Sequence, residues 1–345
     1  MPKTAKNLWN KIVSFDNLLR AFYTVCKKDN GNKYEALLFK ERLDENIIAL
    51  LNALIWKSWV PGPFTCHYVY EPKRRYVEAP CFSDRVVHEA ICSVLSPLFD
   101  RRFIENTFAC RKGKGTLHCS LSLRKMLRSA QKHAHGRKMY FLKADISKYY
   151  PSINHCKLWD AICRVIADKD VLWLLHTIIF DCGYDQYGLP IGSQTSQLFA
   201  NVYLDKFDHY VKSELRVRYY TRYMDDMVIL AYDKKYLHEL KEKLGVWLNE
   251  ELELTWNPKT CVAPVSHGIN YAGYRHWSTH TLPRIKNVKK QRANFKRLTR
   301  LFAEGKTTLE HVRNVVTSFT GYMKHCNGER TAKSTLKYLV LRRPK

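Results

Sequence analysis

The chain has 345 residues, 46% of them hydrophobic, which excludes an intrinsically disordered protein and suffices for two or three domains. Its 58 Lys and Arg against 32 Asp and Glu give a net charge of +26, so the expected partner is a polyanion such as nucleic acid. A membrane-surface or ribosome-associated protein is the alternative that this charge allows. No apolar stretch approaches the length of a membrane span and residues 1–10 lack a signal-peptide core, so we expect no membrane and a cytoplasmic protein.

The eleven cysteines are scattered singly and form no CxxC pair, which argues against a zinc site. We expect reduced, mostly buried thiols, as in a cytosolic protein. His133 and His135 flank one alanine in a polar stretch. A metal role for this pair is weighed against a solvated loop, which is the more common explanation.

The first half of the chain is predicted to be mainly helical. Apolar residues recur at three- and four-residue steps up to about residue 62, where Pro61 and Pro63 end the pattern. Residues 66–70 and 75–78 read as a hairpin with a basic tip, and Ser83 or Asp84 could cap the helix that follows.

Residues 108–116 place two glycines among basic side chains, before a helix that begins near Leu117. Such a flexible cationic loop fits contact with a nucleic-acid backbone, and a charged surface loop explains it equally well. The three basic residues are Arg111, Lys112 and Lys114.

Two strand ends carry carboxylates. Residues 139–145 form a strand that ends at Asp145, and Asp225-Asp226 stand between two strand-like segments, as at the turn of a hairpin. Adjacent carboxylates repel unless a cation lies between them, and Mg²⁺ takes such oxygen ligands together with substrate phosphates. If the strands are neighbours, three carboxylates converge as a two-metal site requires. The alternatives are a solvated turn and a strand-end cap.

Between and after these strands, residues 188–197 form a loop that leads into a helix, and residues 236–251 form an amphipathic helix. Residues 252–256 and 269–274 are further strand candidates. From Arg284 onward three helices are predicted, the third at 336–341, and the first is strongly basic. The cationic side chains of this helix should contact phosphates. The alternative is that they only form a solvent-exposed helix face. They include Lys289, Lys290, Arg292, Lys296 and Arg297.

No P-loop or GxGxxG is present, which argues against a nucleotide-binding Rossmann or NTPase core. Instead, Tyr223-Met-Asp-Asp226 resembles the signature of reverse transcriptases. Residues 141–150 and 189–197 resemble two further motifs of that family, and Lys259 and residues 272–274 resemble its later ones. The motifs stand in family order between about residues 66 and 275.

The resemblance implies an α+β right-hand polymerase with an antiparallel palm sheet and a helical thumb. The fingers would span 1–138, with a helical part and the basic hairpin. The palm would span 139–276, of which part of 157–200 could pack with the fingers, and the basic thumb 277–345. The implied reaction is RNA-directed DNA synthesis with two Mg²⁺ ions, for which Mn²⁺ is an alternative.

A subclass is also implied. Group II intron and retroviral enzymes usually carry Gln-Gly where this chain has Ile191-Gly192, and the pattern here resembles reverse transcriptases of diversity-generating retroelements. Mutagenic retrohoming with errors at template adenines would follow, with a small basic accessory protein oligomer as partner beside template RNA, cDNA or primer, and dNTPs. A retron or phage-defence enzyme that uses a dedicated structured RNA stays open, as does a non-catalytic RNA-binding protein.

The roles of the acidic residues follow from this resemblance. Asp145 and Asp225 should bind the metal ions with help from Asp226, and the carbonyl of Ile146 could complete the coordination.

The nucleotide site is expected to involve several further residues. Tyr150 would exclude a ribose 2′-OH by bulk, unless it is an ordinary core aromatic. Lys73 and Arg75 would contact the triphosphate, unless their turn is only solvated. Lys259 could protonate the pyrophosphate.

The loop before residue 198 is expected to lie at the nucleotide and the template base. Gly192 should allow a close backbone approach to the nucleotide, with Gln194 nearby and Gln197 next to the template. A helix N-cap by Ser193 or Thr195 explains the polar residues equally well. The side chain of Ile191 cannot form the hydrogen bond to the nucleotide that an amide could form. The loss of such a bond costs about 1–3 kcal/mol of binding free energy, which would lower fidelity.

Overall fold

The computed structural model describes residues 4–28, 34–70, 74–181, 183 and 185–342. Contacts divide the chain into two units. The first consists of residues 1–105, 145–217 and 242–258, and the second of residues 106–144, 218–241 and 259–345. One helix, α11 (Lys234–Leu252), contributes its first half to the second unit and its second half to the first.

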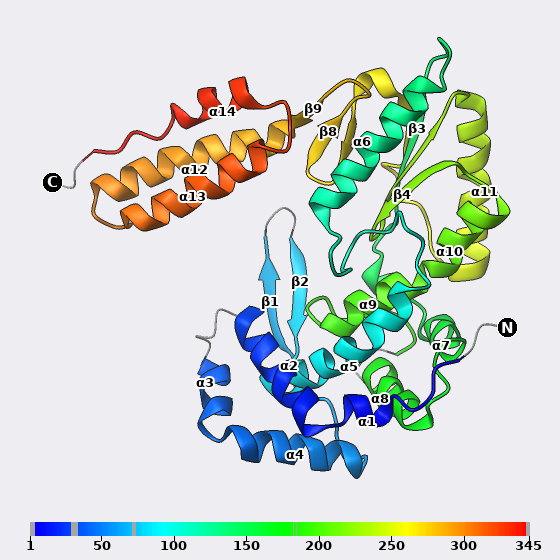
Figure 1. Cartoon of the computed structure of the whole chain (residues 1–345), viewed down its shortest axis with the longest axis vertical. Coiled ribbons are helices and arrows are strands. Elements are labelled where there is room, and N and C mark those ends of the chain that lie inside the picture. The colour runs from blue at the N-terminus through cyan, green and yellow to red at the C-terminus, as the bar shows by residue number, and fades with distance from the viewer. Residues whose placement is uncertain (1–3, 29–33, 71–73, 182, 184, 343–345) are drawn as a thin grey trace. The chain divides into compact units, whose positions relative to one another are not determined.

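The first unit is mostly helical and carries one hairpin, β1 (Thr65–Val69) and β2 (Arg75–Ala79), which pair antiparallel with Tyr68 opposite Tyr76. Strand β1 is exposed along its whole length, and Figure 1 shows β1 and β2 side by side. The remaining elements are α1 (Trp9–Ile12), α2 (Phe15–Lys28), α3 (Tyr34–Glu41), α4 (Leu43–Ile55), α5 (Phe82–Asp100), a 3-10 turn (Tyr150–Ser152), α7 (His155–Cys163), α8 (Lys169–Phe180), α9 (Gln194–Tyr203), α10 (Asp205–His209) and a π-turn (Tyr210–Glu214).

The core of the first unit surrounds α5. This helix is buried along most of its length and packs against α2 on one side and α9 on another. The apolar side chain of Leu95 on this helix is fully buried. Asp84 on the same helix is also buried, and its carboxylate is satisfied there by a hydrogen bond from the Gly62 amide at 2.7 Å. The helix begins at Phe82 with Cys81 at its N-cap, so the predicted cap at Ser83 or Asp84 is wrong.

The second unit contains a four-stranded sheet in the order β4-β5-β3-β6, which pairs strands that are far apart in sequence. Helix α6 (Thr116–Lys132) packs on it, and Leu123 and Leu127 of this helix join Phe141 and Val228 in a buried core. The strands are β3 (Tyr140–Asp145), β4 (Tyr219–Tyr223), β5 (Asp226–Ala231) and β6 (Cys261–Pro264).

A three-stranded sheet and three helices complete the second unit. The sheet contains β7 (Ile269–Tyr271), β8 (Tyr274–His276) and β9 (Thr281–Pro283), preceded by a 3-10 turn (Val265–His267). The helices α12 (Ile285–Ala303), α13 (Leu309–Met323) and α14 (Glu329–Leu336) pack together around Phe295 and Phe319, and Figure 1 shows α12 and α13 side by side.

Further local predictions differ from the structure. Residues 269–274, expected as one strand, form β7 and the start of β8 with a turn at Ala272 and Gly273 between them. The third C-terminal helix lies at 329–336 and not at 336–341. Residues 252–256 form no strand, because α11 continues to Leu252 and only Trp256 makes an isolated bridge. The described cysteines form no disulfide, as expected, but only Cys92 and Cys119 among them are buried.

Candidate active site

The Asp225-Asp226 pair lies at a tight hairpin turn. Strands β4 and β5 pair with Tyr223 opposite Asp226, so the turn itself consists of Met224 and Asp225. Met224 has φ +56°, a left-handed conformation that short hairpin turns require. Both aspartates are partly exposed. The predicted hairpin with carboxylates at its turn is therefore confirmed.

A buried arginine lies beneath this turn, and the sequence alone did not assign it a role. Arg222 is fully buried, and its guanidinium donates a hydrogen bond to the carbonyl of Met224 at 3.0 Å. The main chain of the same residue accepts from the amide of Phe108 and donates to the carbonyl of Asn106. These bonds fix the main chain and the side chain of Arg222 at the turn.

A second cation reaches the turn from β3. The ammonium of Lys143 forms an ion pair with the carboxylate of Asp226, and both side chains are less than one-third exposed. Since β5 is the neighbour of β3 in the sheet, this contact places the end of β3 beside the start of β5. Strand β3 ends at Asp145, two residues after Lys143 on the same strand face.

The main chain at Asp145 is held by a segment that follows α11. The amide of Asn257 donates to the carbonyl of Asp145 at 2.7 Å, and the amide of Ser147 donates to the carbonyl of Thr255 at 2.9 Å. Between them, Ile146 is buried and bridges Trp256. These bonds fix the backbone that carries the predicted catalytic carboxylate.

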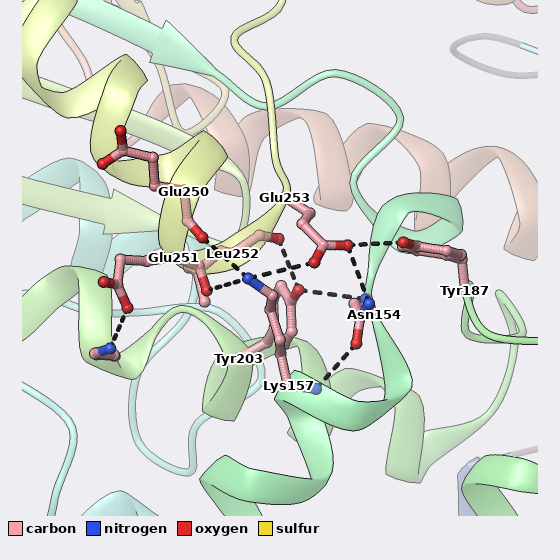
Figure 2. A network of polar contacts seen from close by, with 9 residues as sticks. Asn154, Lys157, Tyr187, Tyr203, Glu250, Glu251, Leu252 and Glu253 are labelled. Atoms are coloured by element: carbon pink, nitrogen blue, oxygen red, sulfur yellow. Dashed lines mark hydrogen bonds and ion pairs between the residues drawn. The ribbon is translucent and has the colours of Figure 1, made fainter.

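The end of α11 is in turn anchored by a polar network, which Figure 2 shows. Lys157 donates to the carbonyls of Glu250 and Glu251 at 3.1 and 3.0 Å and forms an ion pair with Glu253. A cation at a helix C-terminus satisfies carbonyls that have no partner within the helix. Asn154 and Tyr187 also donate to the carboxylate of Glu253, at 3.0 and 2.8 Å.

Tyr203 lies at the centre of this network. Its hydroxyl accepts from the amide of Asn154 at 3.3 Å and donates to the carbonyl of Leu252 at 2.7 Å. Burial raises the pKa of the Tyr203 phenol, so the donor stays protonated. The hydrogen bond from Tyr187 is the main reason why the pKa of Glu253 lies below its ordinary value.

The metal expectation can be tested on these residues. Among the residues that the structure describes, no group of three or more His, Cys, Asp or Glu side chains lies close enough to hold a metal ion. The donors at the turn are carboxylates, which suit Mg²⁺, and the Lys143 ammonium shows that this position accepts a positive charge beside Asp226. The residues at the turn therefore fit a hard divalent cation.

The predicted histidine metal pair is not supported by its local geometry. His133 and His135 are exposed, and the Nδ1 atom of His133 lies 2.7 Å from the carbonyl of Ser129 in the last turn of α6. These contacts agree with the solvated loop that the sequence also allowed.

The loop of residues 188–193 is attached to the hairpin. The amide of Glu78 on β2 donates to the carbonyl of Ile191 at 2.8 Å. Gly192 has φ +138°, and a Cβ at this position would lie 2.7 Å from the carbonyl oxygen of Glu78. The close approach that requires this glycine is therefore to β2.

The other predicted nucleotide-site residues lie in different settings. Tyr150 is partly exposed, while Tyr149 beside it is buried and fills the core position. Arg75 is exposed at the start of β2, and Lys259 is exposed in a turn before β6. The side chain of Gln194 accepts from Lys28 at 3.0 Å. Lys73 lies outside the described residues.

The predicted nucleic-acid contacts are only partly solvent-facing. Arg111 donates to the carbonyl of Thr107 at 2.9 Å, and the Lys114 ammonium lies 5.3 Å from the ring of Phe108, so both side chains are held against their own loop. The side chain of Arg292 turns toward α14, where it donates to Ser334 at 3.2 Å. The exposed members of the predicted set are Lys112, Gln197, Lys289, Lys290, Lys296 and Arg297.

Comparison with known proteins agrees with this geometry. Residues 71–276 match the family model described as reverse transcriptase (RNA-dependent DNA polymerase). Protein YkfC of Escherichia coli (strain K12) is 23% identical over 282 residues, which cover 69% of this chain and 73% of that protein. The retron Ec73 reverse transcriptase of E. coli is 27% identical over 139 residues, 36% of this chain and 43% of that enzyme.

Longer relatives match only in part. The group II intron-encoded protein LtrA of Lactococcus lactis subsp. cremoris is 25% identical over 179 residues, which cover 49% of this chain and 28% of LtrA. Nuclear intron maturase 2 of Arabidopsis thaliana is covered over a similar quarter of its length. A structure of telomerase from Candida albicans with a telomeric RNA fragment is 12% identical with a TM-score of 0.49, covering 85% of this chain and 62% of that one.

In the part of the chain that the structure describes, no helix is long and apolar enough to cross a membrane. The family match confirms the predicted enzyme class, RNA-directed DNA polymerase, and together with the α+β architecture it confirms the predicted right-hand polymerase fold. The chain therefore belongs to the reverse transcriptase (RNA-dependent DNA polymerase) family.

Proposed function

We propose that this chain copies a template RNA into cDNA from dNTPs, with Asp145, Asp225 and Asp226 as ligands of two Mg²⁺ ions. The carbonyl of Ile146 would add a further oxygen ligand. When bound, such ions activate an attacking hydroxyl and stabilise the charge on the triphosphate and the leaving oxygen. The three carboxylates would hold the two metal ions in place. Arg222 fixes the turn that carries two of these carboxylates.

The observation that carries this proposal is the position of the carboxylates in one sheet. Strand β5 starts at Asp226 and is the neighbour of β3, which ends at Asp145. The ion pair of Lys143 with Asp226 supports the same arrangement, because it joins these two strands at their carboxylate ends.

The incoming nucleotide would be bound by the hairpin and the loop attached to it. Arg75, with Lys73 beside it in sequence, would contact the triphosphate, and Tyr150 would exclude a 2′-OH. Ile191, Gly192 and Gln194 would lie beside the base pair. We propose that Lys259 protonates the pyrophosphate, for which its exposed position leaves it accessible.

The remaining cations would bind the template and the primer through phosphates. We propose fingers from 1–138, a palm from 139–276 and a thumb from 277–345. The support is the exposed basic surface of α12, whose lysines and arginines include Lys289, Lys290, Lys296 and Arg297. Binding of this kind weakens steeply with salt.

We further propose that the enzyme belongs to a diversity-generating retroelement and makes errors at template adenines, with a small basic accessory oligomer as partner and a cytoplasmic location. The supporting residue is Ile191, whose side chain has no polar group for the nucleotide. A retron enzyme is the second candidate, because the retron Ec73 reverse transcriptase is among the relatives.

Primer extension on an RNA that contains all four bases tests these proposals, with Mg²⁺, dNTPs and the Asp225→Asn variant as control. DNA synthesis by the wild type and none by Asp225→Asn is expected. Equal synthesis by both would refute the catalytic role of the turn. Sequenced products with errors concentrated opposite adenine support the diversity-generating role, and faithful cDNA favours the retron role.

The same assay examines Ile191. The Ile191→Gln variant regains an amide, and we expect fewer errors opposite adenine with little change in the yield of cDNA. An unchanged error spectrum in this variant would refute the contribution of Ile191 to fidelity.

A further inference from the structure

A closed cluster of three buried polar side chains joins α5 to the start of α9. The Nδ1 atom of His88 lies 2.6 Å from the hydroxyl of Thr195 and 2.9 Å from the hydroxyl of Ser193. The two hydroxyls lie 2.9 Å from each other. We call His88, Ser193 and Thr195 the His88 cluster, and all three residues are almost fully buried.

The cluster is satisfied without a buried charge. Burial lowers the pKa of His88 to about 4, so the ring is neutral near pH 7. A neutral Nδ1 can accept one hydroxyl proton while the second hydroxyl donates to the first, which leaves no polar atom of the triangle without a partner. A fully satisfied buried network of this kind fixes one geometry.

Ser193 is not used to stabilise its own helix. It occupies the N-cap position of α9, where a serine hydroxyl ordinarily accepts from a backbone amide and stabilises the helix. Here the side chain makes no capping hydrogen bond, because the hydroxyl is directed to His88 and Thr195. The N-cap explanation offered by the sequence is therefore wrong for this residue, and the contact with α5 replaces it.

Gln194, the residue after Ser193, is linked to α5 indirectly through Lys28. Lys28 of α2 forms an ion pair of 2.5 Å with Glu89, which follows His88, and donates to the side chain of Gln194 at 3.0 Å. The start of α9 is thus fixed to α5 at Ser193, Gln194 and Thr195.

This attachment completes the support of the loop before it. On one side, the carbonyl of Ile191 is bonded to β2 through Glu78, and Gly192 packs on the carbonyl of the same residue. On the other side, the His88 cluster holds the residue that follows Gly192. Between these two fixed points Ile191 is partly exposed and Gly192 is exposed.

We propose that His88 is a positioning residue for nucleotide selection, which acts through Ser193 and Thr195 to hold the Ile191-Gly192 loop against β2. This inference rests on the proposed function, since it takes that loop to lie beside the incoming nucleotide. Loss of the cluster should loosen the loop and weaken nucleotide binding more than the chemical step, because the carboxylates are carried by other segments.

Two substitutions of His88 and one control test this role. His88→Leu removes the polar atom that both hydroxyls contact, while His88→Gln keeps an amide that can bond to them. Ser93→Ala is the control on the same helix, since Ser93 is an exposed serine whose hydroxyl donates to Asn17 and to the carbonyl of Ala90.

In steady-state primer extension, we expect His88→Leu to raise the KM for dNTPs about tenfold, with kcat changed less than about twofold. His88→Gln should restore most of the wild-type KM, and Ser93→Ala should leave KM unchanged. A His88→Leu enzyme that loses kcat at constant KM, or a Ser93→Ala enzyme with the same rise in KM, would overturn the proposal.

Hydrogen exchange on the protein alone separates this inference from the proposed function. Residues 188–197 should exchange faster in His88→Leu than in wild type, and at the wild-type rate in Ser93→Ala. Unchanged exchange in His88→Leu overturns the positioning role whether or not the enzyme makes DNA. Faster exchange in a protein that shows no synthesis with any RNA would instead place the failure in the proposed function.

Discussion

Removal of a single oxygen atom from Tyr203 should measurably destabilise the first unit. The Tyr203→Phe substitution keeps the ring in its buried position and deletes the hydroxyl that joins Asn154 to Leu252. No cavity of significant size is created, so the effect reports the two hydrogen bonds.

The magnitude follows from those two bonds. A buried hydrogen bond contributes about 1 kcal/mol net, and a buried polar group left without its partner loses about 1–3 kcal/mol. The carbonyl of Leu252 lies at a buried residue, whereas Asn154 is only partly buried, so water can replace one of the two partners. We expect a loss of about 2 kcal/mol in the free energy of unfolding.

The assay is urea unfolding monitored by hydrogen exchange. Peptides from residues 145–217 and 242–258 report on the first unit separately from the second. Tyr23→Phe is the control, because Tyr23 is 56% exposed. The reasoning would be refuted if Tyr203→Phe differed from this control by less than about 0.5 kcal/mol, the range typical of surface substitutions.

Three further outcomes are expected. Gly192→Ala should lose about 1–3 kcal/mol of stability in urea unfolding, because a Cβ would lie 2.7 Å from the carbonyl of Glu78 at a positive φ; a neutral effect would contradict the close approach. The pKa of Glu253 is lowered in the folded state. The stability that its ionised carboxylate contributes is therefore present above the pKa of the unfolded state and is lost as the pH falls through the pKa of the folded state. Wild type should therefore lose more stability than Glu253→Gln when both are titrated below about pH 4.5, and parallel curves would exclude this linkage. Lys289→Gln should reduce the slope of log affinity for RNA against log salt by about 1, measured against Gln131→Ala, a neutral exposed position outside the predicted contacts, and an unchanged slope would remove Lys289 from the phosphate contacts.

The elements that carry the active site were predictable because their signals are local. The apolar strand before Asp145, the strand-like segments on both sides of Asp225 and the helix of residues 234–252 are each determined by neighbours in sequence. The basic helices of the C-terminal region could be predicted for the same reason, although the third was placed several residues too late.

The contacts between distant residues could not be predicted from periodicity. Lys143 looks like an ordinary strand residue in the sequence, because its ion pair with Asp226 forms only when β5 lies beside β3. Arg222 would be expected at the surface as a cation, but the folded chain buries it. For Gly192 the sequence predicts a close approach to the nucleotide, whereas the close approach that the structure shows is to the backbone of Glu78. Such pairings depend on tertiary packing, which local propensity does not encode.

The hydrogen bond that attaches the loop at Ile191 to β2 is made by main-chain atoms, the carbonyl of Ile191 and the amide of Glu78. The side chain at position 191 can therefore change without loss of the bond that holds the loop. Under the proposed role of Ile191 in nucleotide selection, substitutions at this position would change copying accuracy without breaking that bond. A saturation library at residue 191 should accordingly yield folded proteins, and the proposed role predicts that they differ in error rate.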